Sequence, residues 1–178
     1  HADCGGHTSN AQSVWRGATP PYLQAQVDSF CLLSVSSQPW MFETDLSVLR
    51  AVLNRKSQTT VGNKLDAVIV TERDVAGRAS FLTLHGEHIV VVRGEHFRSA
   101  MIPHFGPRSI RSTKFNVERV GDAFAFVGRG FGHGVGLCQV GAMARARAGH
   151  SLRDILTHYY SGTTLATYDR DSTGLYYH

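Results

Sequence analysis

The run GRGFGHGVGLCQVGA, residues 128–142, constrains the fold more than any other part of the chain. In its first half, glycine alternates with Arg129, Phe131, His133 and Val135. Alternating glycines leave one face of an extended segment without side chains, so another backbone or a ligand can approach that face closely. The opposite face would present the arginine, the phenylalanine and the imidazole. The run therefore predicts either a tight crossover from a strand to a helix or the wall of a binding site.

The same run excludes two kinds of nucleotide site. It lacks the lysine and the hydroxyl residue of a P-loop. It is also a poor dinucleotide fingerprint, because no βαβ unit with a downstream acidic residue follows it. Two alternatives stay open: His133 is only a hydrogen-bonded part of the crossover, or His133 and Gln139 contact a ligand.

The composition is that of one globular domain with a mild positive charge. The chain has 178 residues, of which 42% are hydrophobic, and a formal net charge of +4. This charge suits an anionic polymer such as cell wall or nucleic acid. The basic residues are scattered rather than in runs, so we expect no nucleic-acid partner. No apolar run approaches the roughly 20 residues of a membrane helix. A chain that starts at His1 is expected to have been processed or excised from a longer one.

The hydrophobic pattern predicts an α+β fold with a mainly antiparallel sheet and short helices. Residues 1–40 carry many turn formers and aromatic residues, so we expect an irregular but packed segment. Helical patterns start at 44–45 and cover 95–101, 140–148 and 152–159; strand patterns cover 65–71, 79–84, 89–93, 114–120 and 123–127. We divide the single domain into 1–40, the helix and hairpin strands of 41–127, the glycine-rich signature and helices of 128–165, and a tail, 166–178.

The first segment gathers candidate metal ligands. His1, Cys4 and His7 are each three residues apart, with two glycines that let the chain curl, and Cys31 could complete the set. A His2Cys2 set suits a tetrahedral structural zinc. A Cys4–Cys31 disulfide and histidines without a ligand role stay open as alternatives. So does copper held by the amino group and imidazole of His1, as in copper polysaccharide oxygenases. Cys138 stands alone and is expected to be a small buried residue.

Motifs along nearly the whole chain resemble the SpoIID/LytB family (stage II sporulation protein D). The segment GRGFGHGVGLCQVGAMARARAGHSLRDILTHYYSGTTL is similar to the C-terminal signature of that family. Upstream segments that resemble it are HADCGGHTSNAQSVWRG, TERDVAGRASFLTLHG, VVRGEHFRSAM and RSTKFNVE. The resemblance implies a bacterial protein of the cell envelope, periplasmic or secreted. Some members carry zinc close to the His-Gly-Gly segment, so the resemblance favours zinc here.

The resemblance also implies a role in processing the glycan strands of peptidoglycan. The best-known members are lytic transglycosylases, in which a glutamic acid protonates the glycosidic oxygen and a sugar hydroxyl closes a 1,6-anhydro ring. In the family that glutamate lies in an N-terminal half, upstream of the segments matched here, so the catalytic residue is unknown. The acids considered, each expected to be structural or solvated, are Glu43, Glu72, Glu87, Glu95 and Glu118.

Three functions are therefore compared. The first is part of a lytic transglycosylase-like domain, whose partners are glycan strands and the N-terminal half. The second is a non-catalytic module that binds cell wall or enhances a cell-wall amidase. The third is the copper oxygenase based on His1. Sugar contacts are expected from polar and aromatic side chains around the signature, and the candidates are His133, Gln139, Arg129, Ser112 and Tyr159. Core packing is the alternative for the tyrosine.

Overall fold

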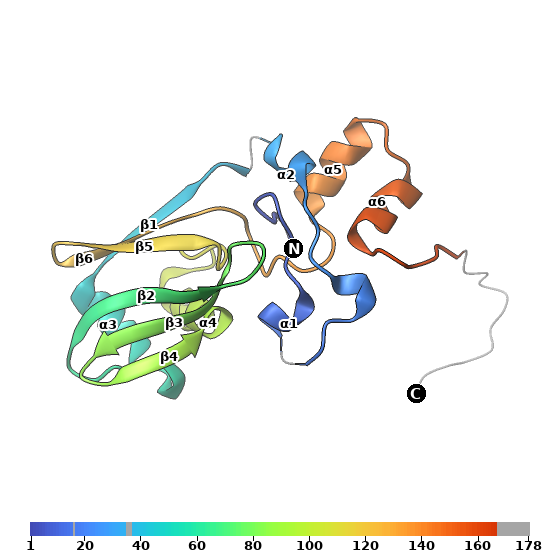
Figure 1. The fold of residues 1–178 in the computed structure, drawn as a ribbon. Coiled ribbons are helices and arrows are strands. Elements are labelled where there is room, and N and C mark those ends of the chain that lie inside the picture. Colours follow the sequence, from blue (N-terminus) through green and yellow to red (C-terminus); the bar gives the residue numbers. More distant parts are fainter. Residues whose placement is uncertain (16, 35–36, 167–178) are drawn as a thin grey trace.

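The structure, a computed structural model, describes residues 1–15, 17–34 and 37–166. Two three-stranded antiparallel sheets occupy one side of the molecule, and the N-terminal segment and the last two helices occupy the other (Figure 1). The N-terminus lies in the middle, between the two sides. The predicted α+β class with antiparallel pairing is confirmed. Most of the predicted tail, from 167 on, lies outside the described residues.

The first sheet has the order β1-β6-β5, built from β1 (Trp40–Asp45), β6 (Ala123–Gly128) and β5 (Phe115–Val120). The hairpin between β5 and β6 is the one that the sequence predicted. Strand β1 was not predicted, because its last residues also carry the signal for the start of a helix. That signal was correct: α3 (Leu46–Leu53) begins directly after the strand. The expected irregular segment therefore ends at a strand, which pairs with β6.

The second sheet is formed by three consecutive strands in the order β2-β3-β4. They are β2 (Leu65–Arg73), β3 (Ala79–Gly86) and β4 (Ile89–Arg93), so all three predicted strands are confirmed. The register between β2 and β3 shifts near Glu72, as in a β-bulge. A tight turn follows, in which the Asp74 carboxylate accepts hydrogen bonds from the backbone amides of Ala76 and Arg78. This turn brings Arg78 to the interior of the molecule.

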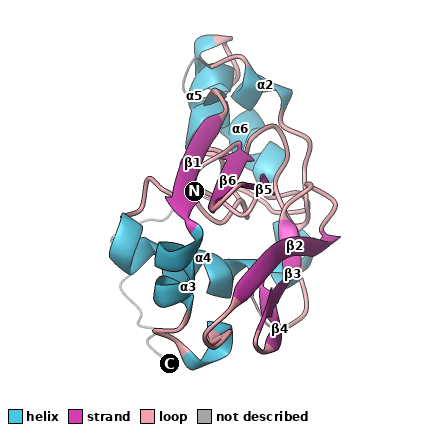
Figure 2. Cartoon of the chain, turned by 90° about the vertical axis from the view of Figure 1, so that its left-hand side faces the viewer, coloured by secondary structure: helices cyan, strands magenta, loops and turns pink. Residues whose placement is uncertain are grey.

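The main core lies between the two sheets and helices α3 and α4 (Gly94–Phe105). Figure 2 shows both helices beside the sheets. Phe97 and Met101 of α4 are fully buried in this core, where the ring of Phe97 packs against aromatic rings of the first sheet. Helix α4 is five residues longer than predicted, one at its start and four at its end, and includes Pro103. Its first residue must be glycine, because a Cβ on Gly94 would overlap the backbone oxygen of Ala79.

Short helices make up the other side of the molecule. They are α1 (Ala11–Val14), α2 (Ser29–Leu32), α5 (Gln139–Arg147) and α6 (Leu152–Tyr159), with 3-10 turns at Pro21–Leu23 and, beside the sheets, at Ser57–Thr59. Ser151 and Asp154 form a capping box at the start of α6, and both predicted C-terminal helices are confirmed. Helices this short depend on packing. They pack on a small second core, formed by Cys4, Cys31, Cys138, Val140, Ile155 and Tyr159. Among the described residues, no helix has the length and apolar character needed to cross a membrane.

Candidate functional site

The N-terminal segment is paired with the glycine-rich signature along its length. Asp3 and Phe131 exchange backbone hydrogen bonds of 2.8 and 3.1 Å, and the amide of Ser9 donates to the oxygen of Gly134. Further along, the first amides of α5 donate to the oxygens of the first two residues of the chain. The signature is not an extended strip: Gly130, Gly132, Gly134 and Gly136 all have positive φ. The glycines thus permit a compact crossover, against which another backbone lies closely.

Arg78 connects this crossover to the sheets. Its side chain is 1% exposed and donates to the oxygens of Gly132 and Cys4, both at 3.1 Å. Burial lowers the pKa of its guanidinium. A Cβ on Gly134 would overlap the guanidinium, so the signature passes directly over it. Arg78 was not predicted as a functional residue, because an arginine in a turn after a strand has the pattern of a surface residue.

A buried cluster of possible metal ligands lies where the two segments meet. One carboxylate oxygen of Asp3 and the sulfur atoms of Cys4, Cys31 and Cys138 all lie within 4.8 Å of one another. A tetrahedral zinc with bonds of about 2.3 Å to sulfur requires ligand separations of about 3.8 Å. The group could therefore hold a metal ion after small side-chain movements. The donors suit the ion as well, because thiolate and carboxylate are both zinc ligands.

Without a bound cation, the deprotonated forms of Asp3, Cys4 and Cys138 are disfavoured, because the pKa values of these groups are raised. Burial, followed by the contact with Cys31, raises the pKa of Asp3 to about 6. Hydrogen bonds from Cys138 and Cys4 lower the pKa of Cys31, so the first thiolate forms there. Hydrogen bonds between the thiol groups also raise the pKa of Cys4, and the bond with Cys138 has the largest effect. A bound metal cation would stabilise the deprotonated forms of all four groups.

The structure brings together two of the four predicted metal ligands, Cys4 and Cys31. The two predicted histidines lie outside the cluster. Nδ1 of His1 is 3.1 Å from the oxygen of Val135, and Nδ1 of His7 is 2.7 Å from the oxygen of Thr8. The alternative of a Cys4–Cys31 disulfide is not what the structure has, since both are free thiols.

Asp3 and Cys138 were not predicted as ligands. Asp3 lies between two predicted ligands, but its side chain turns inward to accept hydrogen bonds from the amide of Gly5, the thiol of Cys31 and the hydroxyl of Ser37. Cys138 is buried, as expected, but it is not alone. It reaches the cluster only because α5 begins beside the N-terminal segment. No local sequence signal links residues so far apart.

His133 lies at the edge of the crossover rather than inside an apolar core. Its ring centroid is 5.0 Å from that of Trp15 and 5.5 Å from that of His1, and Trp15 is 48% exposed. The amide of Val135 donates to Nδ1 of His133, so a neutral ring carries its proton on Nε2. That Nε2 has no hydrogen-bond partner among the described residues. An aromatic face and a hydrogen-bond donor therefore lie side by side.

His133 is expected to remain uncharged and to make the fold sensitive to acid. Burial, with the positive charges of Arg78 and Arg98 nearby, lowers its pKa to about 4. The unfolded chain binds a proton near pH 6.5, so the stabilising contribution is complete above that pH and is lost as the pH falls toward 4. The full shift corresponds to about 3 kcal/mol, and the expected loss is smaller because the ring is only half-buried and solvent screens its charge. Urea unfolding of the native chain and His133→Gln at pH 7 and 4.5 checks this. A variant with the same pH dependence as the native chain would contradict it.

The other predicted sugar contacts divide into exposed and buried residues. Gln139 and Arg129 are exposed, at the start of α5 and after β6. Ser112 is fully buried, where its hydroxyl donates to the oxygen of Arg129 and accepts from the amide of Lys114. Tyr159 is also buried, in the second core. The last two side chains thus lie in the interior and not at a surface.

Tyr159→Phe is expected to destabilise the protein by about 1 to 3 kcal/mol, because it removes a partner from a buried carboxylate. The Tyr159 hydroxyl donates to Asp28 at 2.7 Å, and Asp28 is fully buried. The control is Tyr160→Phe, which loses only a 3.4 Å contact with the amide of Leu137. Denaturant unfolding of both variants measures the difference. Equal losses would contradict a special role for the Asp28 contact.

Comparison with known proteins finds similarity to relatives named for sporulation and for the enhancement of an amidase. It is 28% identical over 169 residues to Stage II sporulation protein D of Bacillus subtilis, which covers 92% of this chain and 43% of that protein. It is also 28% identical over 167 residues to an uncharacterized protein of Brachyspira hyodysenteriae, covering 94% of this chain and 42% of the relative. The chain thus spans less than half the length of these relatives.

A third relative matches a shorter segment at a higher sequence identity. The Amidase enhancer of Bacillus subtilis is 44% identical over 63 residues, or 35% of this chain and 9% of the relative. Together, these relatives confirm the resemblance to the SpoIID/LytB family. A family model described as "Domain of unknown function (DUF8618)" matches residues 34–136. Since this match covers more than half of the chain, the protein belongs to the DUF8618 family.

Proposed function

We propose that the protein has a role in the bacterial cell wall, where it binds glycan strands of peptidoglycan as part of a lytic transglycosylase-like protein. The observation that carries this proposal is the position of His133, which is half-buried beside the exposed ring of Trp15 within the signature that resembles SpoIID. The names of the relatives support the coarser part, a role connected with sporulation or the cell wall. The location that follows is the cell envelope or the medium outside the cell.

The geometry around His133 suits an uncharged sugar. Sugars present apolar faces to aromatic rings and hydroxyl groups to polar side chains. Trp15 offers the ring, and the lowered pKa of His133 keeps its imidazole neutral, with a proton on Nε2 to donate. Arg93 donates to the backbone oxygens of Gln12 and Ser13 and so fixes α1, which leads into Trp15. The second sheet therefore holds in place the segment that carries Trp15.

The catalytic acid is proposed to come from outside these residues. Four of the five glutamates considered are exposed. Glu95 is half-buried, but its carboxylate already forms an ion pair with Arg98 at 3.5 Å. Glycan binding is therefore assigned to this chain, and cleavage to the whole protein.

Incubation with denuded glycan strands tests the proposal. Native chain is expected to bind the strands, and Trp15→Ala is expected to weaken binding by at least about fivefold, as for the loss of one aromatic contact. Tyr22→Ala is the matched control, since Tyr22 is a similarly exposed aromatic residue on the 3-10 turn of Pro21–Leu23. Mass spectrometry detects anhydro-ended products. Their formation by this chain alone would contradict the assignment of cleavage to other residues, and absence of binding would contradict the function.

The similarity to the Amidase enhancer favours a second candidate, a module that increases the activity of a cell-wall amidase. Adding the chain to such an amidase with intact cell walls and measuring the release of stem peptides tests it. An increase without anhydro-ended products would support this function, and no increase would contradict it.

The ion suited to the buried cluster is proposed to be zinc, in a structural role. The donor set of three thiols and one carboxylate would be saturated, and saturated zinc sites contribute to folding. When bound, zinc would supply folding free energy by cross-linking the N-terminal segment, α2 and the start of α5 through Cys4, Cys31 and Cys138. Copper held by His1 is the alternative, and metal analysis of the native chain distinguishes the two ions.

A further inference from the structure

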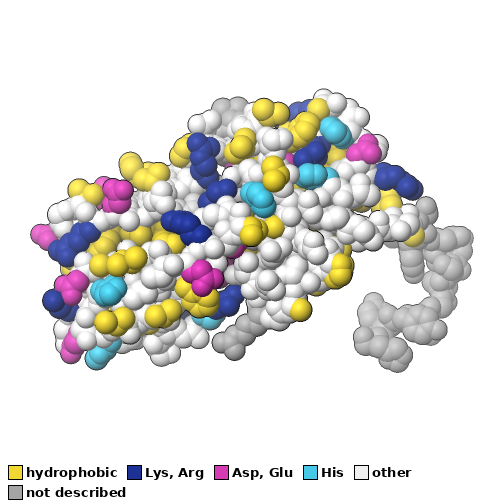
Figure 3. Space-filling model, in the orientation of Figure 1, with side chains coloured by type: hydrophobic (Ala, Val, Ile, Leu, Met, Phe, Trp, Pro, Cys, Tyr) yellow, Lys and Arg dark blue, Asp and Glu magenta, His cyan; other side chains and the backbone are white. Residues whose placement is uncertain are grey.

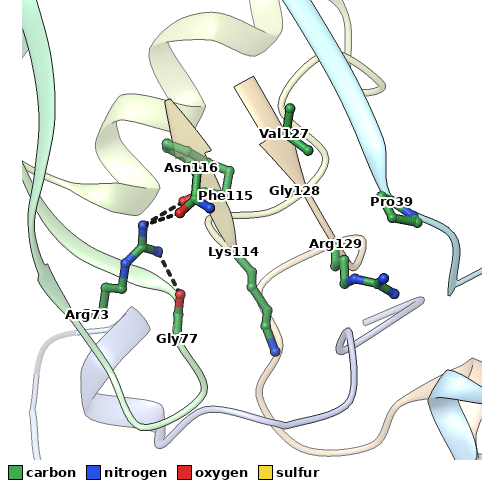
Figure 4. A pocket seen from close by; sticks show the side chains of 9 residues that line it. All are labelled: Pro39, Arg73, Gly77, Lys114, Phe115, Asn116, Val127, Gly128 and Arg129. Atoms are coloured by element: carbon green, nitrogen blue, oxygen red, sulfur yellow. Dashed lines mark hydrogen bonds between the residues drawn. The ribbon is translucent and has the colours of Figure 1, made fainter. Parts of the chain in front are cut away.

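A second polar site lies on the sheet side of the crossover. It is a pocket of about 410 Å³ between the ends of β2, β5 and β6. Figure 4 shows Arg73, Lys114 and Arg129 around it, each from a different segment of the chain. Lys and Arg side chains also gather near the middle of the face in Figure 3, where the sheets meet the rest of the molecule. No acidic residue lines the pocket.

The three cations are fixed in place by uncharged oxygens. Arg73 donates to the backbone oxygens of Gly77 and Phe115 and to the side-chain oxygen of Asn116. Lys114 and Arg129 each donate to one backbone oxygen, at 2.8 and 3.3 Å. None of the three forms an ion pair with a carboxylate in the part of the chain that the structure describes. The pocket thus combines ordered positive charges with no counter-charge, which favours an anion.

We propose that this pocket binds the lactyl carboxylate of a muramic acid residue in a glycan strand without stem peptides. This inference rests on the proposed function, because such a strand carries one free carboxylate in each disaccharide. A lactyl group combines a carboxylate with a methyl group. The pocket correspondingly combines the three cations with the apolar side chains of Pro39 and Val127.

The position of the pocket supports the same ligand. Gly128 and Arg129 line the pocket and are also the first residues of the signature that leads to His133. His133 is four positions after Arg129, so their Cα atoms are at most about 14 Å apart. A short oligosaccharide is long enough to span this distance. The pocket would then distinguish peptidoglycan from a neutral glycan with the same sugar backbone.

Calorimetric titration of the full chain with three tetrasaccharides tests the inference. They are the GlcNAc–MurNAc repeat with free carboxylates, its methyl ester, and tetra-N-acetylchitotetraose, which has no lactyl groups. The native chain is expected to bind the free acid at least about tenfold more tightly than the ester, as for charge-assisted hydrogen bonds. Arg73→Gln and Arg129→Gln are each expected to reduce this preference to about twofold or less. Arg153→Gln, which removes an exposed charge from α6, is expected to keep it.

The outcomes separate this inference from the function on which it rests. Equal binding of acid and ester by the native chain would overturn the carboxylate pocket and leave glycan binding intact. This comparison needs no variant, so a substitution that fails to fold does not affect it. Absence of binding to all three sugars would overturn both proposals. Equally effective competition by a glycerol phosphate oligomer would show a general anion site and overturn the assignment to muramic acid.

Discussion

Gly134→Ala is expected to lower the free energy of unfolding by at least about 3 kcal/mol, or to prevent folding of the crossover. Two effects add at this position. The backbone has a φ of +81°, which a residue with a side chain adopts only at a cost. The new Cβ would also overlap the guanidinium of Arg78, which is buried and holds the oxygens of Gly132 and Cys4. Arg78 cannot move without leaving these oxygens unsatisfied.

Gly149→Ala is the matched control for this substitution. Gly149 has a φ of +89°, close to that of Gly134, but no atom lies within 4 Å of its added Cβ. The free energy of unfolding of this variant should fall only by the cost of backbone strain, about 1 kcal/mol. Denaturant unfolding of the two variants separates strain from overlap. Similar losses in both would show that Arg78 is not closely packed against the signature.

Binding of zinc is expected to stabilise the native chain strongly. Added to reduced, metal-free protein at a free concentration 1,000-fold above its dissociation constant, it should raise the free energy of unfolding by about 4 kcal/mol. The reason is that the unfolded chain does not hold Asp3, Cys4, Cys31 and Cys138 together. Calorimetric melting with and without zinc, together with the zinc stoichiometry, measures the effect.

Two variants distinguish the ligand set of the structure from the one predicted from the sequence. Cys138→Ser should abolish most of the zinc stabilisation, because it removes one of the three sulfur ligands. His7→Asn should leave it nearly unchanged, because the imidazole faces the oxygen of Thr8. The opposite pattern, with zinc retained by the first variant and lost from the second, would show that the histidines are the ligands.

The parts of the fold that sequence predicts correctly are those with local causes. The second sheet is a chain of adjacent hairpins, so hydrophobic alternation and turn residues locate its strands. Strand β1 pairs with β6 more than 70 residues away. The hydrophobicity of its six residues does not alternate, although their burial in the structure does. Its existence depends on a partner that local patterns cannot reveal.

The site divides in the same way. Cys4 and Cys31 were predicted as ligands from residue type and glycine spacing. Asp3 and Cys138 join them only through the backbone pairing between the N-terminal segment and the signature, which is a tertiary event. His133 could be identified as a candidate contact residue from sequence, because glycines flank it on both sides. The burial of Arg78 could not, because its causes are spread over two distant segments.

The contact between Arg78 and Gly134 also has an evolutionary consequence. The guanidinium fills the space that a side chain at 134 would need, so the two positions are not free to vary independently. A descendant with a shorter residue at 78 would gain room at 134 but lose the donors for two carbonyl groups, and it would need a new polar partner for them. Changes at the hairpin and at the signature should therefore arise together or not at all.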